Sequence, residues 1–282
     1  MSEIAFGQVD EIIINALKED LGHGDITTAS VIIGAHRSSA SLVAKSDMVL
    51  AGLLFADKTF ALVDQSIKFK GLKKDGVRVK QGTVLVNIQG DTSSILRAER
   101  VALNILQRLS GIATLTERYV KALKGTGVKI LDTRKTAPGL RIMDKYAVKA
   151  GGGHNHRFGL FDGVMIKDNH IIAAGGIAKA VRLARENIHH LVKIEVETSN
   201  IIEVKSALAA GADVIMLDNM SVSLMEKAVA LIRGTAPVVL IEASGNITLD
   251  NVRLVADTGV DMISVGSLTH SAPAADISLG FR

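Results

Sequence analysis

The sequence contains neither cysteine nor tryptophan, and only seven Phe and two Tyr among its 282 residues. The absence of cysteine excludes disulfides, thiolate-bound zinc, iron–sulfur clusters and thiol catalysis. Any metal must therefore bind to carboxylates, histidine or water. No apolar run approaches the roughly 18 residues that span a bilayer, and the first residues lack the basic-then-apolar pattern of a signal peptide. We expect a soluble cytoplasmic protein with no membrane partner.

The net charge is small, but the charged residues are unevenly distributed along the chain. The formal net charge is +4, which is too small to indicate a nucleic-acid partner, and 48% hydrophobic residues exclude a disordered chain. Residues 129–167 hold eight Lys or Arg against three Asp, a net charge of +5. Lys145 and Lys149 lie four apart in this segment, and we interpret them as an exposed helix face. The other cations predict a pocket for anions.

Helical and extended patterns alternate in the N-terminal part. Apolar residues at helical spacing predict a helix over 8–19, and residues 39–50 are typical of strands. The pattern from 52 to 64 predicts a second helix, and 93–124 has the longest helical pattern in the chain. Gly111 lies within this last pattern and is a candidate for a kink. Because the composition changes after this helix, we place a domain boundary close to it.

The segment from 71 to 90 has short alternating runs on either side of Asp75-Gly76. An Asp-Gly pair between such runs is a common signal for a β-hairpin. A lysine-bearing hairpin is also found in lipoyl and biotinyl carrier modules, but the motif around the carrier lysine is absent. We therefore predict a purely structural hairpin.

From residue 129 onward, short apolar runs alternate with helical patterns. Such runs are typical of parallel strands buried on both faces and joined by right-handed crossovers. The predicted strands are KILDTRK, VMIKDNH, KIEVET, VIMLDN, VVLIEASG and DMISVGSLT. The predicted helices lie near 141–150, 175–187, 200–210, 221–233 and 248–258. Six parallel strands with outer helices predict either an α/β barrel or an open doubly wound sheet.

Each of these six strands ends in polar residues or glycine. The ends are Asp132-Thr133-Arg134-Lys135, Lys167-Asp168, Glu197, Asp218-Asn219, Ser244-Gly245 and Gly266. A single polar strand end is usually just a turn, but six in succession favour a site, because the carboxyl ends of parallel barrel strands share one face. Arg134, Lys135 and Lys167 would line its mouth, where arginine suits carboxylates and phosphates.

The segment GGGHNHR, residues 151–157, has two interpretations. Its glycines suit a helix C-cap with a loop, and they also suit a loop that aims His156 and Arg157 at the mouth. Glu197 and Asp218 end adjacent strands and are candidates for ion pairing, for a general base or for Mg²⁺ binding. The loops after the last strands have the place of the usual barrel phosphate site.

These residues favour a barrel enzyme that joins an acidic small molecule to a phosphorylated one with Mg²⁺. Two other classes stay open. One is a Schiff-base aldolase or isomerase with Lys167 as its amine, and the other is a ligand-binding relative without turnover.

Several motifs together resemble one family. They are EDLGHGDITT, AERVALNILQRLSGIATLT, ILDTRKTAPGLR, YAVKAGGGHNHRFGLFDGVMIKDNH, GADVIMLDNM and IEASGNIT. In this order they resemble the quinolinate phosphoribosyltransferases, also called carboxylating nicotinate-nucleotide pyrophosphorylases. The resemblance implies the conversion of quinolinate and phosphoribosyl pyrophosphate to nicotinate mononucleotide, pyrophosphate and CO₂, a step of NAD biosynthesis.

The resemblance also implies roles for the candidate residues. For quinolinate they are Arg100, Thr133, Arg134, Lys135, His156 and Arg157. For phosphoribosyl pyrophosphate they are Lys135, Lys167, Glu197, Asp218, Ser244, Gly245, Asn246, Val265, Gly266 and Ser267. Of these, Lys135, Lys167, Glu197 and Asp218 would be catalytic, and Glu197 and Asp218 would hold Mg²⁺ partly through substrate and water.

The family's architecture implies an N-terminal α/β sandwich followed by an open, incomplete parallel α/β barrel of about six strands. The sandwich would cover 1–112, with 270–282 returning to it, and the barrel would cover 113–269. Family members are at least homodimers, so Arg100 is expected to reach the partner's site.

Overall fold

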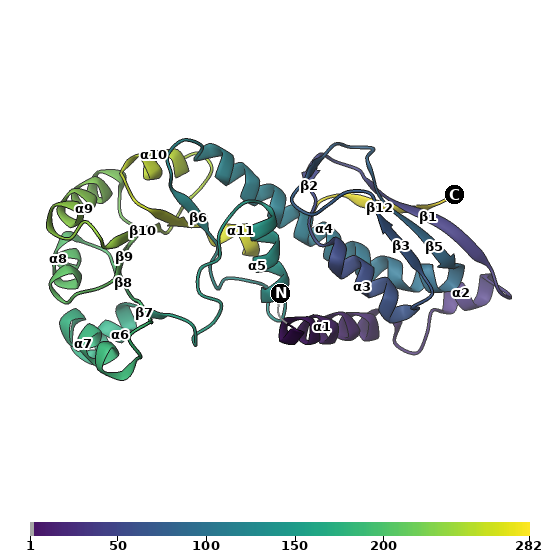
Figure 1. Cartoon of the computed structure of the whole chain (residues 1–282), viewed down its shortest axis with the longest axis horizontal. Coiled ribbons are helices and arrows are strands. Elements are labelled where there is room, and N and C mark those ends of the chain that lie inside the picture. The colour runs from purple at the N-terminus through teal and green to yellow at the C-terminus, as the bar shows by residue number, and fades with distance from the viewer. Residues whose placement is uncertain (1–2) are drawn as a thin grey trace. The chain divides into compact units, whose positions relative to one another are not determined.

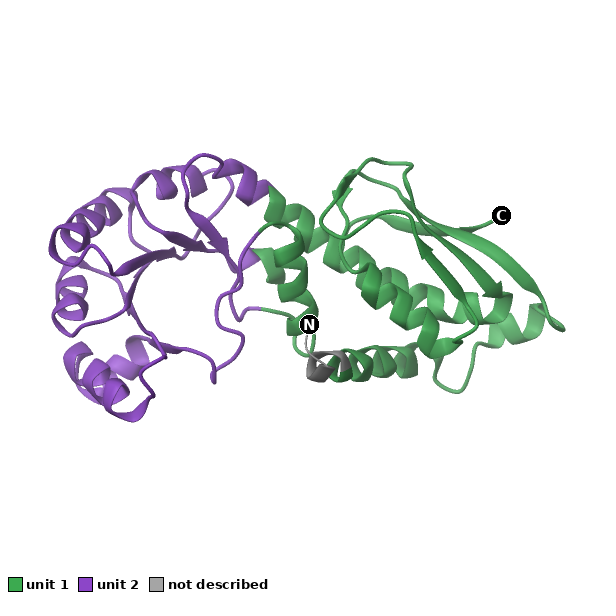
Figure 2. Cartoon of the chain, in the orientation of Figure 1, with its two compact units in different colours: residues 1–117, 136–152, 268–282 green, residues 118–135, 153–267 purple. Residues whose placement is uncertain are grey.

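A computed structural model describes the backbone of residues 3–282, with side chains from residue 7 onward. Its internal contacts divide the chain into two units, each built from separate segments (Figure 2). Unit 1 comprises Met1–Glu117, Thr136–Gly152 and Leu268–Arg282, and unit 2 comprises Arg118–Lys135 and Gly153–Ser267. Among the described residues, no helix is both long and apolar enough to cross a membrane.

Unit 1 is built on a four-stranded antiparallel sheet in the order β12-β1-β5-β3 (Figure 1). The strands are β1 (Arg37–Ala44), β3 (Lys68–Gly71), β5 (Val84–Asp91) and β12 (Ile277–Phe281). Alternate residues of β1, such as Ala40 and Leu42, are buried in a core with Phe60 and Leu106. The helices are α1 (Glu3–Leu21), α2 (Ile26–Val31), α3 (Leu53–Val63), α4 (Thr92–Ala122), α5 (Arg141–Ala150) and α11 (Ser267–His270). The predicted helices over 8–19, 52–64 and 93–124 are therefore confirmed.

The hairpin predicted at Asp75-Gly76 is wrong. β3 pairs with β5, whereas β4 (Arg78–Val79) pairs with β2 (Met48–Val49). The Asp75 carboxylate is engaged elsewhere: it accepts the backbone N–H of Gly52 at 2.8 Å, at the start of α3, and the Tyr146 hydroxyl at 2.6 Å. The Asp75 side chain thus connects its loop to helices α3 and α5 by hydrogen bonds and does not form part of a hairpin turn.

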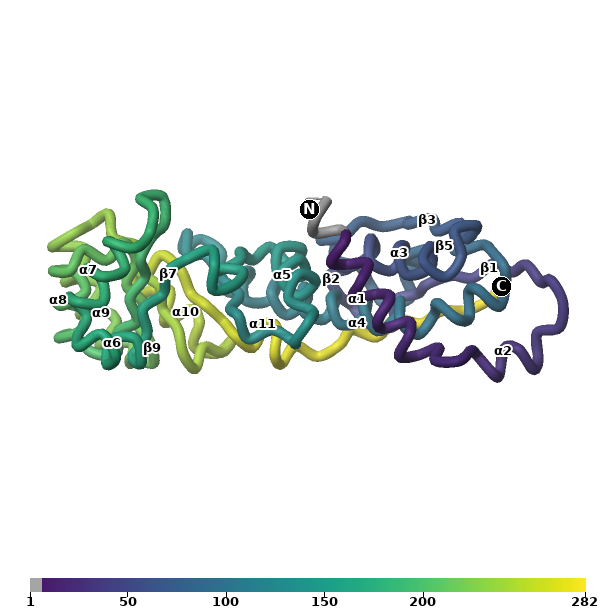
Figure 3. Tube along the Cα trace, turned by 90° about the horizontal axis from the view of Figure 1, so that it is seen from below, coloured from purple at the N-terminus to yellow at the C-terminus, as the bar shows by residue number. Residues whose placement is uncertain are grey.

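Gly111 lies within α4, which runs unbroken for 31 residues. A Cβ at this position would lie 2.0 Å from the carbonyl oxygen of Pro273. The glycine is therefore required by the close approach of the C-terminal segment, and a kink at this position stays a prediction. That segment continues into β12, which pairs with β1 and runs beside it in both views (Figures 1 and 3).

Unit 2 is an open parallel barrel of six strands. The order β6-β11-β10-β9-β8-β7 leaves β6 and β7 at the two edges, and the helices α7 to α10 form the outer layer (Figure 1). The strands are β6 (Lys129–Leu131), β7 (Val164–Ile166), β8 (Ile194–Thr198), β9 (Val214–Asp218), β10 (Leu240–Ser244) and β11 (Met262–Ser264). The helices are α6 (Asp168–Ala174), α7 (Ile177–Asn187), α8 (Ile201–Ala209), α9 (Val222–Thr235) and α10 (Val252–Asp257). All six predicted strands are confirmed.

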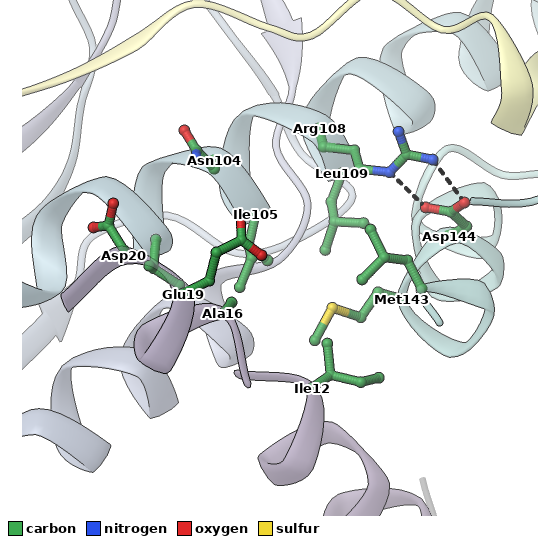
Figure 4. Close-up of a pocket in the computed structure, with 12 residues that line it drawn as sticks. Ile12, Ala16, Glu19, Asp20, Asn104, Ile105, Arg108, Leu109, Met143 and Asp144 are labelled. Atoms are coloured by element: carbon green, nitrogen blue, oxygen red, sulfur yellow. Dashed lines mark hydrogen bonds and ion pairs between the residues drawn. The ribbon is translucent and has the colours of Figure 1, made fainter. Parts of the chain in front are cut away.

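Residues 136–152, which the sequence pattern assigned to the barrel, cluster with unit 1. Asp144 of α5 is 0% exposed and accepts two hydrogen bonds from Arg108 of α4, at 2.9 and 2.8 Å (Figure 4). Lys145 is only 2% exposed, so its interpretation as part of an exposed face is wrong, whereas Lys149 is exposed. Helix α5 thus packs in unit 1 with two of its charged side chains, Asp144 and Lys145, buried.

The Arg108–Asp144 pair borders an apolar cavity of about 250 Å³ in unit 1. Ile12 and Ala16 of α1, Ile105 and Leu109 of α4, and Met143 of α5 contribute to its walls (Figure 4). Most of the residues that line this cavity are aliphatic.

Candidate active site

A polar cavity of about 630 Å³ opens at the carboxyl ends of the barrel strands. Every strand of unit 2, or the segment directly after it, contributes at least one lining residue. The lining comprises Thr133, Arg134, Lys135, His156, Arg157, Met165, Lys167, Glu197, Met216, Asp218, Asn219, Glu242, Ser244, Gly245, Asn246 and Ser264. The prediction that the polar strand ends meet at one face is therefore confirmed.

Strand geometry explains why these side chains face inward. Successive side chains on a strand alternate between its two faces, so residues two apart share one face. Met165 of β7 and Lys167, which follows the strand in an extended conformation, face the cavity together in this way, as do Met216 and Asp218 on β9. The floor of the cavity is thus formed by residues within the strands and its rim by the residues that end them.

Four cations line the cavity. Arg134 and Lys135 follow β6 and are exposed, whereas Lys167 forms an ion pair with Glu197. The Arg157 guanidinium donates to the carbonyl oxygen of Gly163 at 2.9 Å. Burial, and then the charge of Arg134, lower the pKa of Arg157 below its usual value, but the value for arginine starts so high that the group stays cationic. The cavity therefore presents fixed positive charge on its β6 side.

The GGGHNHR segment runs alongside β6 after its glycines end α5. His154 forms a parallel bridge with Leu131, donating its backbone N–H to Ile130 at 2.8 Å and accepting from Asp132 at 3.1 Å. The buried Asp132 carboxylate accepts the backbone N–H of His156 at 2.8 Å. Each interpretation of the segment therefore holds for a different part of it. The glycines end α5, and His156 and Arg157 line the cavity, with His156 hydrogen-bonded to Asp132 directly after β6.

Two buried carboxylates lie below His156. Its Nε2 is 3.1 Å from Glu195 Oε2 on β8 and 3.5 Å from Glu242 Oε2 on β10. Glu195 is 7% exposed and Glu242 is 1% exposed, and the Oε1 atom of each is buried with no hydrogen-bond partner among the described residues. Burial, and then the nearby charge of Glu195, raise the pKa of Glu242 to about 8.

These three residues have the composition of a divalent-metal site, and their ligand atoms lie within 4.8 Å of one another. However, His156 Nδ1 accepts the backbone N–H of Arg157 at 2.7 Å. An imidazole that accepts at Nδ1 carries its proton on Nε2, and that nitrogen then has no lone pair for a metal. The geometry therefore favours a hydrogen bond from Nε2–H to Glu195.

Replacing Glu242 with glutamine should change how stability depends on pH. The unfolded carboxyl ionises near its usual value of 4.5, whereas the folded one keeps its proton to about pH 8. The raised pKa therefore contributes stability below pH 4.5, and this contribution is lost as pH rises toward 8. Urea unfolding measures the free energy of unfolding at each pH. The difference between Glu242→Gln and the wild type should shift by roughly 2–4 kcal/mol in favour of the variant from pH 5 to pH 9. The exposed Glu226→Gln serves as the control, and parallel profiles for wild type and Glu242→Gln would contradict this expectation.

The opposite rim is a rigid turn structure. Gly245 has φ +89°, and a Cβ there would lie 2.2 Å from Asn219 Oδ1. Asn219 and Asn246 both have positive φ, and the Asn246 side chain donates to Asn219 Oδ1 at 3.0 Å. Asn219 in turn donates to Asp218 Oδ2 at 2.6 Å. This network fixes the orientation of Asp218 at the end of β9.

Most of the predicted site residues line this one cavity, but four do not. Arg100 is exposed on α4 in unit 1. Val265 is buried and donates its N–H to Leu131, and Gly266 and Ser267 follow it. Glu195 and Glu242 were not among the predicted site residues, although an acidic residue inside an otherwise apolar strand is a usable signal, since it must face a polar interior.

Known proteins resemble the chain over nearly its whole length. Residues 25–110 match the family "Quinolinate phosphoribosyl transferase, N-terminal domain", and residues 112–280 match its C-terminal domain. The chain is 48% identical to a probable carboxylating nicotinate-nucleotide pyrophosphorylase of Synechocystis over 93% of this chain and 89% of the relative. It is 45% identical to the Bacillus subtilis protein of the same description, over 96% of this chain and 93% of that one.

Solved structures agree with these relatives. The nicotinate-nucleotide pyrophosphorylase of Francisella tularensis superposes with a TM-score of 0.92 at 41% identity, covering 98% of this chain and 96% of that one. NadC from Streptococcus pyogenes gives the same TM-score at 44% identity, with 98% and 96% covered. With both domains matched in order and the cavity formed by the strand ends of the second, the chain belongs to the quinolinate phosphoribosyltransferase family.

Proposed function

We propose that this chain transfers a phosphoribosyl group from phosphoribosyl pyrophosphate to quinolinate and releases CO₂, giving nicotinate mononucleotide and pyrophosphate. The observation that carries the proposal is the polar cavity, in which four cations face two carboxylates at the ends of the barrel strands. Quinolinate has two adjacent carboxylates and the donor has a phosphate and a pyrophosphate, so both substrates need clustered cations.

Arg134 and Arg157 would hold the quinolinate carboxylates, because these guanidinium groups lie on the same side of the cavity. Thr133, Lys135 and His156 lie beside them. Lys135 and Lys167 would neutralise the charge of the departing pyrophosphate. The positive charge on the pyridinium nitrogen formed by the transfer stabilises the electron pair left on C2 when the C2 carboxylate leaves as CO₂, and a proton from water then completes the C2–H bond. Positioning and electrostatics therefore supply most of the rate, and no dedicated base is required.

Mg²⁺ is the metal that the donor set fits. Glu197 and Asp218 lie at the ends of neighbouring strands β8 and β9, and Mg²⁺ typically combines one or two carboxylates with substrate phosphates and water. When bound, the ion would neutralise the pyrophosphate as it leaves. The chain's own contribution is to orient the two carboxylates: Lys167 pairs with Glu197, and Asn219 donates to Asp218.

Ser244, Gly245 and Asn246 would receive the 5′-phosphate, together with the neighbouring Val265, Gly266 and Ser267. Gly245→Ala should weaken binding of phosphoribosyl pyrophosphate about 100-fold, because the new Cβ collides with Asn219 at a positive φ. Calorimetry measures this effect. Gly234→Ala is the matched control, since this helical glycine has open space around its Cβ position. Equal affinity in Gly245→Ala and wild type would contradict the assignment.

We further propose a homodimer or larger assembly in which Arg100 reaches the partner's site, as the resemblance to the family implies. Arg100 is exposed on α4, as such a role requires. Mixing Arg100→Ala subunits with Arg134→Ala subunits should then restore part of the activity, up to about a quarter of wild type, because some mixed dimers hold one intact site. No recovery after verified subunit exchange would contradict the shared site.

The Schiff-base alternative is disfavoured by the ion pair between Lys167 and Glu197. An ammonium held by a carboxylate is not the neutral amine that attacks a carbonyl. One assay separates the phosphoribosyl-transfer, aldolase and non-catalytic possibilities: release of pyrophosphate and CO₂ from the two substrates with Mg²⁺. Release that depends on both substrates supports the proposal, and its absence from folded protein would refute it. A cytoplasmic location, without membrane or nucleic-acid partners, completes the proposal.

A further inference from the structure

Both ring nitrogens of His156 are engaged by the protein itself. Nδ1 accepts the backbone N–H of Arg157 at 2.7 Å, and Nε2 faces Glu195 Oε2 at 3.1 Å. With the proton on Nε2, the ring has no further N–H to donate to a substrate. In this arrangement the imidazole donates to the protein and not to a quinolinate carboxylate, although the ring lines the cavity.

The contacts of His156 instead connect the barrel strands to Arg157. Asp132, directly after β6, accepts the His156 backbone N–H at 2.8 Å, and Glu195 on β8 faces the ring from the other side. The ring holds the Arg157 backbone through Nδ1, and the Arg157 guanidinium donates to Gly163. The position of Arg157 is thus fixed by a series of hydrogen bonds that starts at a buried carboxylate.

We propose that Glu195 is a positioning residue for anion binding: by orienting the His156 imidazole, it places Arg157 in the cavity. The inference rests on the proposed function, in which Arg157 holds a quinolinate carboxylate. Glu195 is well placed for this role, because the side chain is 7% exposed and lies on the inner face of β8, two residues before Glu197. Glu242 Oε2, at 3.5 Å from Nε2, forms the second wall that confines the ring.

The test uses the whole chain and measures binding of quinolinate and of phosphoribosyl pyrophosphate separately by calorimetry. Glu195→Ala should weaken quinolinate binding about tenfold, since small displacements of a binding group carry costs of this size, and should leave the donor's affinity within about twofold. Glu195→Gln keeps an oxygen that accepts from Nε2–H and should recover most of the affinity. Thr198→Val is the matched control: Thr198 is buried on the same strand, but its hydroxyl donates to the Met216 carbonyl within the sheet.

A double-mutant cycle separates positioning from a general loss of structure. If Glu195 acts through Arg157, Glu195→Ala should cause no further loss in an Arg157→Ala background. Additive losses, equal loss for both substrates, or a Glu195→Gln variant as weak as Glu195→Ala would each overturn the inference. Failure of the wild type to bind quinolinate would instead refute the proposed function, so the two failures are distinguishable.

Discussion

Arg157→Ala should weaken quinolinate binding about 100-fold, and Arg134→Ala should do the same. Each substitution removes one cation from a partly buried pair of opposite charges, and such truncations cost about 2–5 kcal/mol, largely because the remaining charge is left unpaired. A loss near 3 kcal/mol corresponds to about 100-fold in affinity. Phosphoribosyl pyrophosphate should still bind to both variants, because Lys167 and the Gly245 rim are unchanged. Calorimetry with each substrate alone provides the measurement.

The matched control for this experiment is Arg182→Ala. Arg182 lies on α7 of the same unit and forms an exposed pair with Glu186, four residues away at 3.3 Å. Its removal lowers the positive charge by the same amount without touching the cavity, so a general effect of net charge would appear here too. Unchanged quinolinate affinity in both Arg157→Ala and Arg134→Ala would contradict the carboxylate assignment.

Arg108→Ala should lower the free energy of unfolding by about 2–4 kcal/mol, somewhat less than the roughly 3–5 kcal/mol typical of a fully buried pair, because the Arg108 side chain is 33% exposed. Asp144 is 0% exposed and accepts both hydrogen bonds from the Arg108 guanidinium, so the substitution leaves a buried carboxylate that keeps the Ala137 N–H at 3.2 Å but loses the Arg108 cation (Figure 4). Urea denaturation followed by circular dichroism measures the loss. α5 should be the first element to lose its protection against hydrogen exchange, since Asp144 lies in its first turn.

Two further variants make this expectation specific. Arg108→Met combined with Asp144→Asn removes both charges together and should recover part of the stability, because no unpaired charge stays buried. Arg253→Ala, which breaks an exposed pair with Asp257, should cost less than about 1 kcal/mol. If Arg108→Ala were no more destabilising than Arg253→Ala, the pair would contribute as little as a surface ion pair.

The barrel could be predicted from the sequence because its strands are short, apolar and bounded by polar residues. The same rule located most of the site, since it applies to every strand end: Lys167, Glu197 and Asp218 all line the cavity. Gly245 was also found in this way, although the collision that makes the glycine necessary depends on Asn219, from another strand. Such contacts between strands are not encoded in local periodicity.

Other features depended on long-range packing and were missed. Glu195 and Glu242 each interrupt an apolar strand, which marks them as facing a polar interior, but their common partner His156 lies on a distant segment. Lys145 has the four-residue spacing of an exposed helix face, yet it is buried because α5 packs within unit 1. Asp75 precedes a glycine as a hairpin turn does, but its carboxylate is bound by Gly52 and Tyr146. In each case a distant partner outweighs the local signal.

The pairing of β12 with β1 has a consequence for how the protein is made. Strand β1 ends at residue 44, and its neighbour on one side begins only at residue 277. During synthesis, β1 can pair with β5 early, but its other edge stays open until Ile277–Phe281 has been made. An open edge strand is a template for wrong pairing. One edge of Arg37–Ala44 therefore stays unpaired while residues 45–276 are synthesised, and deletion of Ile277–Phe281 should promote aggregation.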